Sequence, residues 1–121
     1  MVNRGFPRMK FYIIENSRIP QALSLFINIW AITLYPFIIS RDEMSEDVLQ
    51  HETIHIHQQK ELFVLLFYIL YVWDWIVGLI KYKDKQKAYF QIRFEQEAYD
   101  KMYVENYLTT RKKYSWRNYK V

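Results

Sequence analysis

All three histidines of this 121-residue chain lie in one short polar stretch, residues 50–60, and their spacing suits metal chemistry. The stretch contains the pattern His-Glu-x-x-His as His51, Glu52 and His55. Positions i and i+4 of a helix share one face, so the two imidazoles can converge on a single metal ion, and zinc suits such ligands. Glu52 lies to one side, where a carboxylate can act as a general base. The stretch therefore predicts a zinc-dependent hydrolase.

The same residues could instead form a solvated polar helix face, because a five-residue pattern is a short signal. The helical setting and a carboxylate further along the chain favour the metal site. The chain has no cysteine, so any metal must be held by histidine and carboxylate side chains. We expect His57 to lie outside the site, since at i+2 from His55 it points to another side of the helix.

The third metal ligand is expected in residues 88–108, which we predict to form one helix. Counted at about 100° per residue, the apolar positions fall on one side, with Glu95 in their middle and Glu97 nearly opposite. A carboxylate that faces the core needs a partner, and a metal ion on His51 and His55 would be one. We therefore predict Glu95 as the third ligand, with Glu97 as the alternative. The apolar positions are Ala88, Ile92, Ala98, Tyr99, Met102 and Tyr103.

Residues 94–99 read Phe-Glu-Gln-Glu-Ala-Tyr. This segment resembles the Glu-x-x-Ala-Asp segment of integral-membrane and prenyl-protein zinc peptidases and the Glu-x-Glu-Ala segment of small HExxH domains from bacteria and phage. Residues 50–108 as a whole look like a family of short bacterial zincin-like proteins of the gluzincin type. The metzincin family is a poorer match, because Gln58 and Glu61 stand where it has glycine and a further ligand. The aspartate that the similar peptidases have four residues after the ligand glutamate is Tyr99 here.

The resemblance implies a zinc metallopeptidase that hydrolyses a peptide or protein substrate. Zinc on the three predicted ligands would activate a water molecule, and Glu52 would accept its proton and pass it to the leaving amine. Tyr99 and Tyr103 are candidates for stabilising the oxyanion. Two other functions stay open: a catalytically inactive zincin-like protein with structural zinc, and a membrane-associated interaction protein whose motif is fortuitous.

The composition and element pattern predict one domain, residues 1–121, of the α+β class and mainly helical. With 51% hydrophobic residues and only two glycines, the chain can bury one core between long regular elements. We expect a strand at residues 11–14, a short helix at residues 23–30, and a strand at residues 31–40 that Pro36 confines to a sheet edge or a bulge.

The metal-binding helix is expected to start at a capping box headed by Asp47. Together these elements predict a minimal zincin-like fold, in which a short N-terminal β-hairpin or edge strand accompanies two or three packed helices that carry the metal site. In zinc peptidases of this general plan, the edge strand pairs with an extended substrate.

Residues 62–80 are apolar over the length of a membrane span, apart from Asp74 and Gly78. A carboxylate near the centre of such a segment is costly in lipid. We therefore favour a buried or interfacial helix, broken near Asp74 or Gly78, over a true membrane span.

The distribution of charge bears on partners and location. Residues 109–121 form a basic, aromatic tail that we expect to be solvated, with contact to an anionic membrane surface as the alternative and no specific nucleic acid as a partner. Residues 1–20 lack an apolar run of signal length. We therefore expect a cytoplasmic protein, at the inner face of the membrane if it binds lipid. The oligomeric state does not follow from the sequence.

Overall fold

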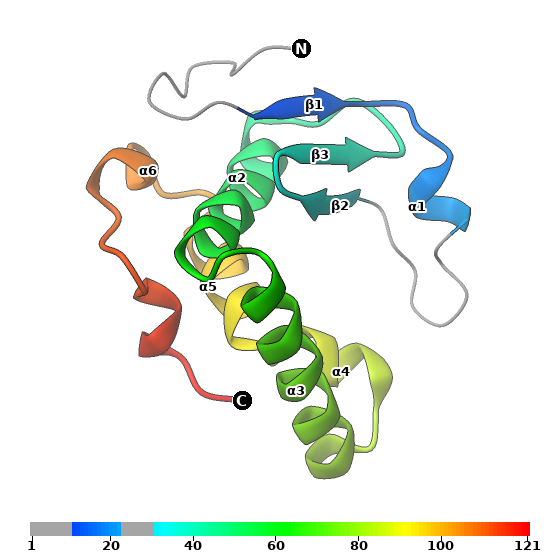
Figure 1. Ribbon diagram of the computed structural model, residues 1–121, viewed down its shortest axis with the longest axis vertical. Helices are drawn as coiled ribbons and strands as arrows, with labels where there is room; N and C mark the ends of the chain where they lie inside the picture. The colour runs from blue at the N-terminus through cyan, green and yellow to red at the C-terminus, as the bar shows by residue number, and fades with distance from the viewer. Residues whose placement is uncertain (1–10, 23–30) are drawn as a thin grey trace.

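The chain folds into a small sheet at one end and a set of packed helices below it (Figure 1), and the computed structural model describes residues 11–22 and 31–121. The mainly helical α+β class is confirmed. The strands are β1 (Tyr12–Ile14), β2 (Ala31–Leu34) and β3 (Phe37–Ser40). The helices are α1 (Ile19–Ala22), α2 (Glu46–Glu61), α3 (Leu65–Tyr82), α4 (Lys85–Phe90), α5 (Arg93–Lys101) and α6 (Tyr107–Thr110), followed by a short 3-10 helix, η1 (Ser115–Asn118).

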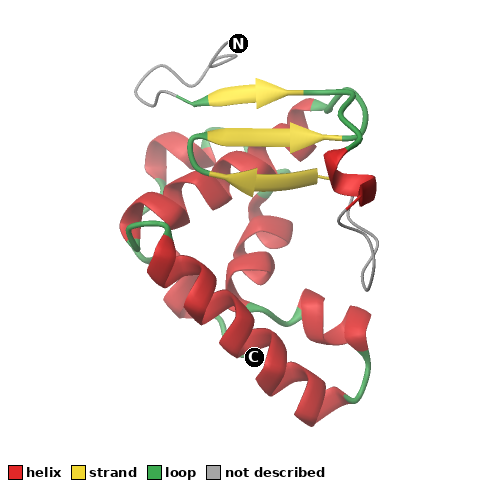
Figure 2. Cartoon of the chain, turned by 45° about the vertical axis from the view of Figure 1, so that its right-hand side comes forward, coloured by secondary structure: helices red, strands yellow, loops and turns green. Residues whose placement is uncertain are grey.

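The predicted single strand at residues 31–40 is wrong, because the chain reverses at Tyr35 and Pro36 to make a hairpin of β2 and β3. Proline has no N–H to give to a strand ladder, so it ends β2 instead of lying within a longer strand. The sheet order is β1-β3-β2, with β1 parallel to β3 and β2 antiparallel to it. In Figure 2, β2 is the strand on the side of the helices. The helix predicted at residues 23–30 lies outside the described residues.

Helix α2 starts one residue before Asp47, so the predicted capping box is wrong. Ser45 is the N-cap, and its hydroxyl accepts a hydrogen bond from the N–H of Val48 at 3.3 Å. Asp47 instead lies in the first turn, where its negative charge interacts favourably with the positive end of the helix dipole. The predicted strand at residues 11–14 is confirmed as β1, apart from its first residue.

Helix α3 runs unbroken through Asp74 and Gly78, so the predicted break there is wrong. The Asp74 carboxylate is buried and is held by Arg93, whose Nε and Nη2 atoms lie 2.8 and 2.9 Å from its oxygens. Gly78 brings α3 against α4, because a Cβ at this position would lie 3.0 Å from the Cα of Ala88. Asp74 and Gly78, the two exceptions to the apolar pattern, therefore both contribute to the packing of a continuous helix.

The single helix predicted over residues 88–108 is also wrong, since the chain forms α4, α5 and α6 with breaks between them. The break before α5 has a specific cause: the Asp74 carboxylate accepts a hydrogen bond from the backbone N–H of Arg93 at 3.1 Å, as an N-cap would. α5 keeps the local helical spacing across Glu95 and Glu97, on which the ligand prediction depends.

Most residues of the C-terminal tail are exposed, as predicted, but part of the tail packs against α5. Trp116 in η1 is buried in the cluster that contains Phe67 and Phe94. The Arg111 side chain is almost fully buried and bridges α2 and α5 through ion pairs. The tail therefore covers one side of α2 and α5, and burying a side chain such as Trp116 contributes about 1.5–3 kcal/mol or more to the free energy of unfolding.

Candidate metal centre

Helix α2 is buried although many of its side chains are polar. Burying such groups is costly unless each has a partner. Here the partners come from three directions, since α2 contacts β2, α3 and α5. The buried polar residues of α2 are His51, Glu52, Thr53, His55, Gln58 and Gln59.

The structure brings His51, His55 and Glu95 together. Oε1 of Glu95 lies 3.1 Å from Nε2 of His51 and 3.2 Å from Nε2 of His55. All three side chains are at least nine-tenths buried. Two imidazole nitrogens thus converge on one carboxylate oxygen, with the histidines supplied by α2 and the carboxylate by α5.

Glu52 adds a second carboxylate beside the two histidines. The ligand atoms of His51, Glu52 and His55 all lie within 4.8 Å of one another, so this buried group can hold a metal ion. One Glu52 oxygen is 3.8 Å from Nε2 of His51, and the other lies 3.5 Å from the Thr33 hydroxyl of β2. Glu52 therefore lies between the histidines and the sheet edge, to one side of the Glu95 contact.

The electrostatics of the site are those expected of a cation site. Burial alone would raise the pKa of Glu95, but the charge of His55 and hydrogen bonds from both histidines hold that pKa well below its ordinary value. Burial alone would lower the pKa of His55, but the Glu95 carboxylate outweighs it and raises the pKa to about 9. In the metal-free chain, a proton on His55 thus provides the positive charge that balances Glu95.

Burial has the opposite effect on Glu52. Loss of solvent raises the pKa of Glu52 above its ordinary value, against the opposing attraction of His51 and His55. A carboxylate with a raised pKa is a better proton acceptor, which is the property that a general base requires.

Gln58 supports His55 and was not predicted as a site residue. Its Nε2 donates to Oε1 of Glu97 at 2.9 Å and to the carbonyl of Phe94 at 3.1 Å. Because both of these partners are acceptors, the Gln58 Oε1 must face Nδ1 of His55, which it does at 2.7 Å. Neutral His55 is thereby held with its proton on Nδ1 and with Nε2 directed at Glu95, the tautomer that a metal ligand needs. The spacing i, i+3 from His55 was the signal in the sequence.

Glu97, the alternative ligand, has other partners. Its carboxylate accepts from Nε of Arg111 at 2.6 Å, from the Tyr107 hydroxyl at 2.6 Å and from Gln58. The Arg111 guanidinium lowers the pKa of Glu97 although burial opposes this. The side chain is fully buried, so the expectation that Glu97 faces away from the core is wrong. The tail that covers this side of α5 is the reason.

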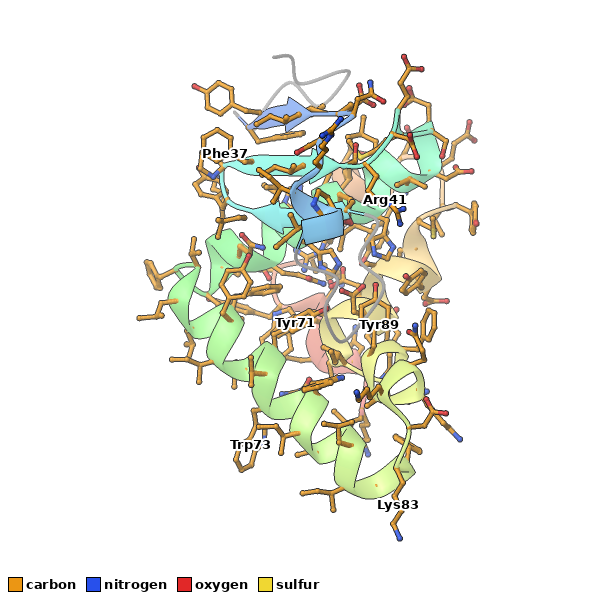
Figure 3. All side chains as sticks on the ribbon, turned by 90° about the vertical axis from the view of Figure 1, so that its right-hand side faces the viewer. Phe37, Arg41, Tyr71, Trp73, Lys83 and Tyr89 are labelled. Atoms are coloured by element: carbon orange, nitrogen blue, oxygen red, sulfur yellow. The ribbon has the colours of Figure 1, made fainter. Side chains whose placement is uncertain are left out.

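The tyrosine that contacts Glu95 is Tyr71, which was not among the two predicted. Its hydroxyl donates to Oε2 of Glu95 at 2.6 Å, from the inner face of α3 (Figure 3). Tyr99 packs its ring on His51 at a centroid distance of 4.3 Å, and its hydroxyl lies 2.9 Å from that of Tyr89. Tyr103 is 72% exposed and does not line the site. A buried hydroxyl in an apolar helix requires a polar partner, and this was the signal for Tyr71.

His57 lies outside the site, as predicted. It is half-buried, and burial together with Arg111 and Lys60 lowers its pKa to about 4.

His51 lacks a partner like the one that Gln58 gives to His55. Nδ1 of His51 is buried and has no hydrogen-bond partner in the described part of the chain. The ring of Tyr99, the residue four positions after Glu95, lies beside His51. His51 is therefore less firmly oriented than His55.

A cavity of about 640 Å³ opens in front of the site. His51, Glu52, His55 and Glu95 form its polar end, and the edge of β2 forms one wall. Most of the remaining wall is apolar or aromatic: Phe67, Tyr68, Tyr71, Val72, Trp75, Tyr89, Phe90, Ile92, Tyr99 and Met102. The cavity is of a size that suits part of a peptide with apolar side chains.

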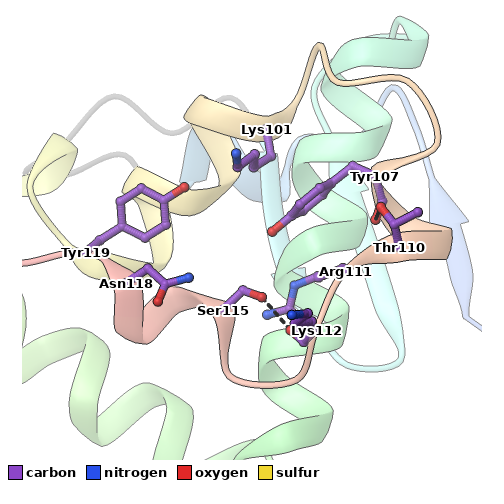
Figure 4. A pocket seen from close by; sticks show the side chains of 8 residues that line it. All are labelled: Lys101, Tyr107, Thr110, Arg111, Lys112, Ser115, Asn118 and Tyr119. Carbon is purple, nitrogen blue, oxygen red and sulfur yellow. Dashed lines mark hydrogen bonds between the residues drawn. The ribbon is translucent and has the colours of Figure 1, made fainter.

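A second cavity, of about 410 Å³, lies between α5 and the C-terminal tail (Figure 4). It is lined by side chains such as Lys101, Tyr107 and Asn118, and in it the Ser115 hydroxyl donates to the carbonyl of Lys112. Its lining contains no histidine or carboxylate. It therefore offers none of the histidine or carboxylate ligands that a zinc ion needs in a chain without cysteine.

Comparison with known proteins finds no family model, no curated protein and no solved structure that matches this chain. The geometry of the described residues is therefore the basis on which a function can be proposed.

Proposed function

We propose that this chain is a zinc-dependent peptidase of the zincin-like type. The observation that carries the proposal is the convergence of His51 and His55, through their Nε2 atoms, on one oxygen of Glu95, with Glu52 beside them. The three predicted ligands come from two different helices. An accidental His-Glu-x-x-His pattern on a polar surface would have no buried carboxylate facing both rings.

The donor set fits zinc. Two imidazole nitrogens and one carboxylate oxygen are ligands that zinc accepts, and three protein ligands leave one position open, as in catalytic zinc sites. Gln58 fixes the His55 tautomer that binding requires, and Tyr71 holds the second oxygen of Glu95. Zinc bound here would supply a Lewis acid that polarises a carbonyl and makes water reactive near neutral pH.

The remaining steps belong to side chains of this chain. Glu52 accepts a proton on its carboxylate and returns it to the leaving amine, for which its raised pKa is suited. The hydroxyl pair of Tyr89 and Tyr99 lines the cavity and can donate a hydrogen bond to the carbonyl oxygen of the substrate as its negative charge develops. The apolar walls exclude water around the reacting groups.

The substrate that fits the cavity is an extended peptide with apolar side chains. β2 is an edge strand, and its residues Ala31, Ile32 and Thr33 line the cavity. The Thr33 carbonyl, however, already accepts hydrogen bonds from Gln59 and Tyr68. Pairing of a substrate strand with β2 is therefore restricted to the part around Ala31, and the aromatic wall must supply the rest of the binding energy.

The test is turnover of a mixture of unstructured peptides by the zinc-loaded chain. We expect cleavage that stops on chelation and returns on adding zinc. Glu52→Gln should keep its zinc and lose cleavage by a factor of at least about 100, because the amide has the shape of the carboxylate without its basicity. Glu43→Gln, at an exposed position, is the matched control and should cleave normally. Full activity in Glu52→Gln would refute the role given to Glu52.

A further inference from the structure

The outer face of α3 is apolar and exposed along the whole helix. Figure 3 shows Trp73 pointing away from the rest of the fold and Tyr71 pointing inward. At about 100° per residue, the exposed apolar side chains fall within an arc of about 120°, opposite the buried Phe67, Asp74 and Gly78. We call these side chains the α3 face; they are between 43% and 73% exposed and comprise Leu65, Leu66, Ile69, Val72, Trp73, Ile76 and Ile80.

An apolar surface of this extent indicates a binding surface, because soluble monomers rarely expose long contiguous apolar patches. The α3 face offers little to orient a protein partner. It contains no charged residue, and the one carboxylate of the helix, Asp74, is buried and paired with Arg93. Apart from the indole N–H of Trp73, these seven side chains carry no hydrogen-bonding group of the kind that fixes the register of a protein interface.

Lysines stand at both ends of the α3 face. Lys60 lies in the last turn of α2, three residues before Phe63, whose side chain is 87% exposed. At the other end, Lys81, Lys83 and Lys85 are exposed around the junction of α3 and α4, where Asp84 is the only acid (Figure 3 labels Lys83). An apolar helix face with tryptophan and leucine, flanked by lysine, has the composition of helices that lie in the surface of an anionic membrane.

We propose that the α3 face binds the surface of an anionic lipid bilayer, with the helix lying along the interface. α3 is long and apolar enough to cross a membrane by length and composition. Its inner side, however, is occupied by the Asp74–Arg93 ion pair and by the close contact of Gly78 with Ala88. Lipid can therefore reach one side of α3 only, which is the arrangement of an interfacial helix.

The α3 face continues into the cavity in front of the candidate metal site. Val72 belongs to the α3 face and also lines the cavity. Phe90, the partly exposed last residue of α4, lines the same cavity. A peptide segment lying at the bilayer surface would therefore reach the metal site without leaving an apolar environment. This substrate class rests on the proposed function, whereas lipid binding does not.

The test is co-sedimentation of the full chain with vesicles of phosphatidylcholine, with and without phosphatidylglycerol. We expect binding to the anionic vesicles that weakens as salt is added. The double variant Ile69→Gln, Trp73→Gln should bind at least about tenfold more weakly, because two side chains no longer enter the interface. The control Tyr103→Gln, Val104→Gln removes two exposed apolar side chains elsewhere and should bind normally. Thermal unfolding of each variant shows that the fold is kept.

Three outcomes would overturn the lipid proposal. The wild type could fail to bind vesicles, or the α3 variant and its control could bind them equally. In the third outcome, the wild type is a dimer that does not bind lipid, and the α3 variant is a monomer. The last outcome would assign the α3 face to a second copy of the chain. The Glu52→Gln variant should bind vesicles normally, so failure of hydrolysis and failure of lipid binding are separable. If one peptide is cleaved equally well free in solution and anchored to vesicles, the proposal of a substrate at the bilayer surface is wrong, whereas the proposal of lipid binding is unaffected.

Discussion

Gln58 and Glu97 are joined by a hydrogen bond of 2.9 Å, in which Nε2 of Gln58 donates to Oε1 of Glu97. Through it, the ion pair between Glu97 and Arg111 in the tail is connected to the orientation of His55 in the site. The residue first considered as an alternative ligand is thus two hydrogen bonds away from one of the histidines.

Replacing Gln58 by Leu should weaken zinc binding by about 10–100-fold, because His55 loses the acceptor that fixes its tautomer. Gln59→Leu is the matched control, since Gln59 holds the backbone of Thr33 and Tyr35 instead of a histidine. That variant should be less stable but should keep its zinc affinity. Competition with a chelator of known affinity measures both. Equal affinities in the two variants would show that Gln58 does not orient His55.

Replacing Glu97 by Ala should lower the free energy of unfolding by about 3 kcal/mol, because Arg111 keeps only Glu61 as a partner in a buried position. Glu105→Ala, at an exposed position, should change it by less than about 0.5 kcal/mol. Urea unfolding gives both values. A Glu97→Ala protein as stable as the wild type would mean that the tail does not pack on α5 as described.

The stability of the metal-free chain should depend on His57 between pH 6.5 and 4. The pKa of His57 falls from 6.5 to about 4 on folding, so only the unfolded chain takes up this proton within that range. Its contribution to stability is therefore constant above pH 6.5 and is lost as the pH falls towards 4, by as much as about 2 kcal/mol. His57→Asn should remove this part of the pH dependence. The rest of the chain is the same in both proteins, so the difference between their unfolding curves isolates His57.

Local spacing was enough to predict that Glu95, and not Glu97, meets the histidines. The prediction did not need the long helix, because α5 alone carries the helical spacing around Glu95. The placement of Glu97 failed for a different reason. The apolar positions in the sequence define one buried face of α5. The tail buries the opposite face as well, because Arg111 contacts Glu97 from 14 residues further along the chain.

The errors in the helix boundaries also arise from contacts between distant residues. The start of α5 is set by Asp74, which lies 19 residues before Arg93 and caps it through space. In the sequence, Asp74 looked like a defect in an apolar segment. Tyr71 was missed in the same way, since its partner Glu95 is 24 residues away. Short-range patterns predicted which side chains meet at His51 and His55, whereas the packing that orients these side chains depended on pairs that no local pattern shows.

The zinc content of the purified chain, measured by elemental analysis with matched variants, tests the metal site most directly. We predict about one zinc per wild-type chain after loading and removal of excess metal, and little zinc in His51→Ala, His55→Ala and Glu95→Ala, because each removes one of the three proposed ligands. Glu105→Ala should retain the wild-type content. A wild-type chain that holds no zinc, or a Glu95→Ala chain that holds as much as the wild type, would contradict the assignment.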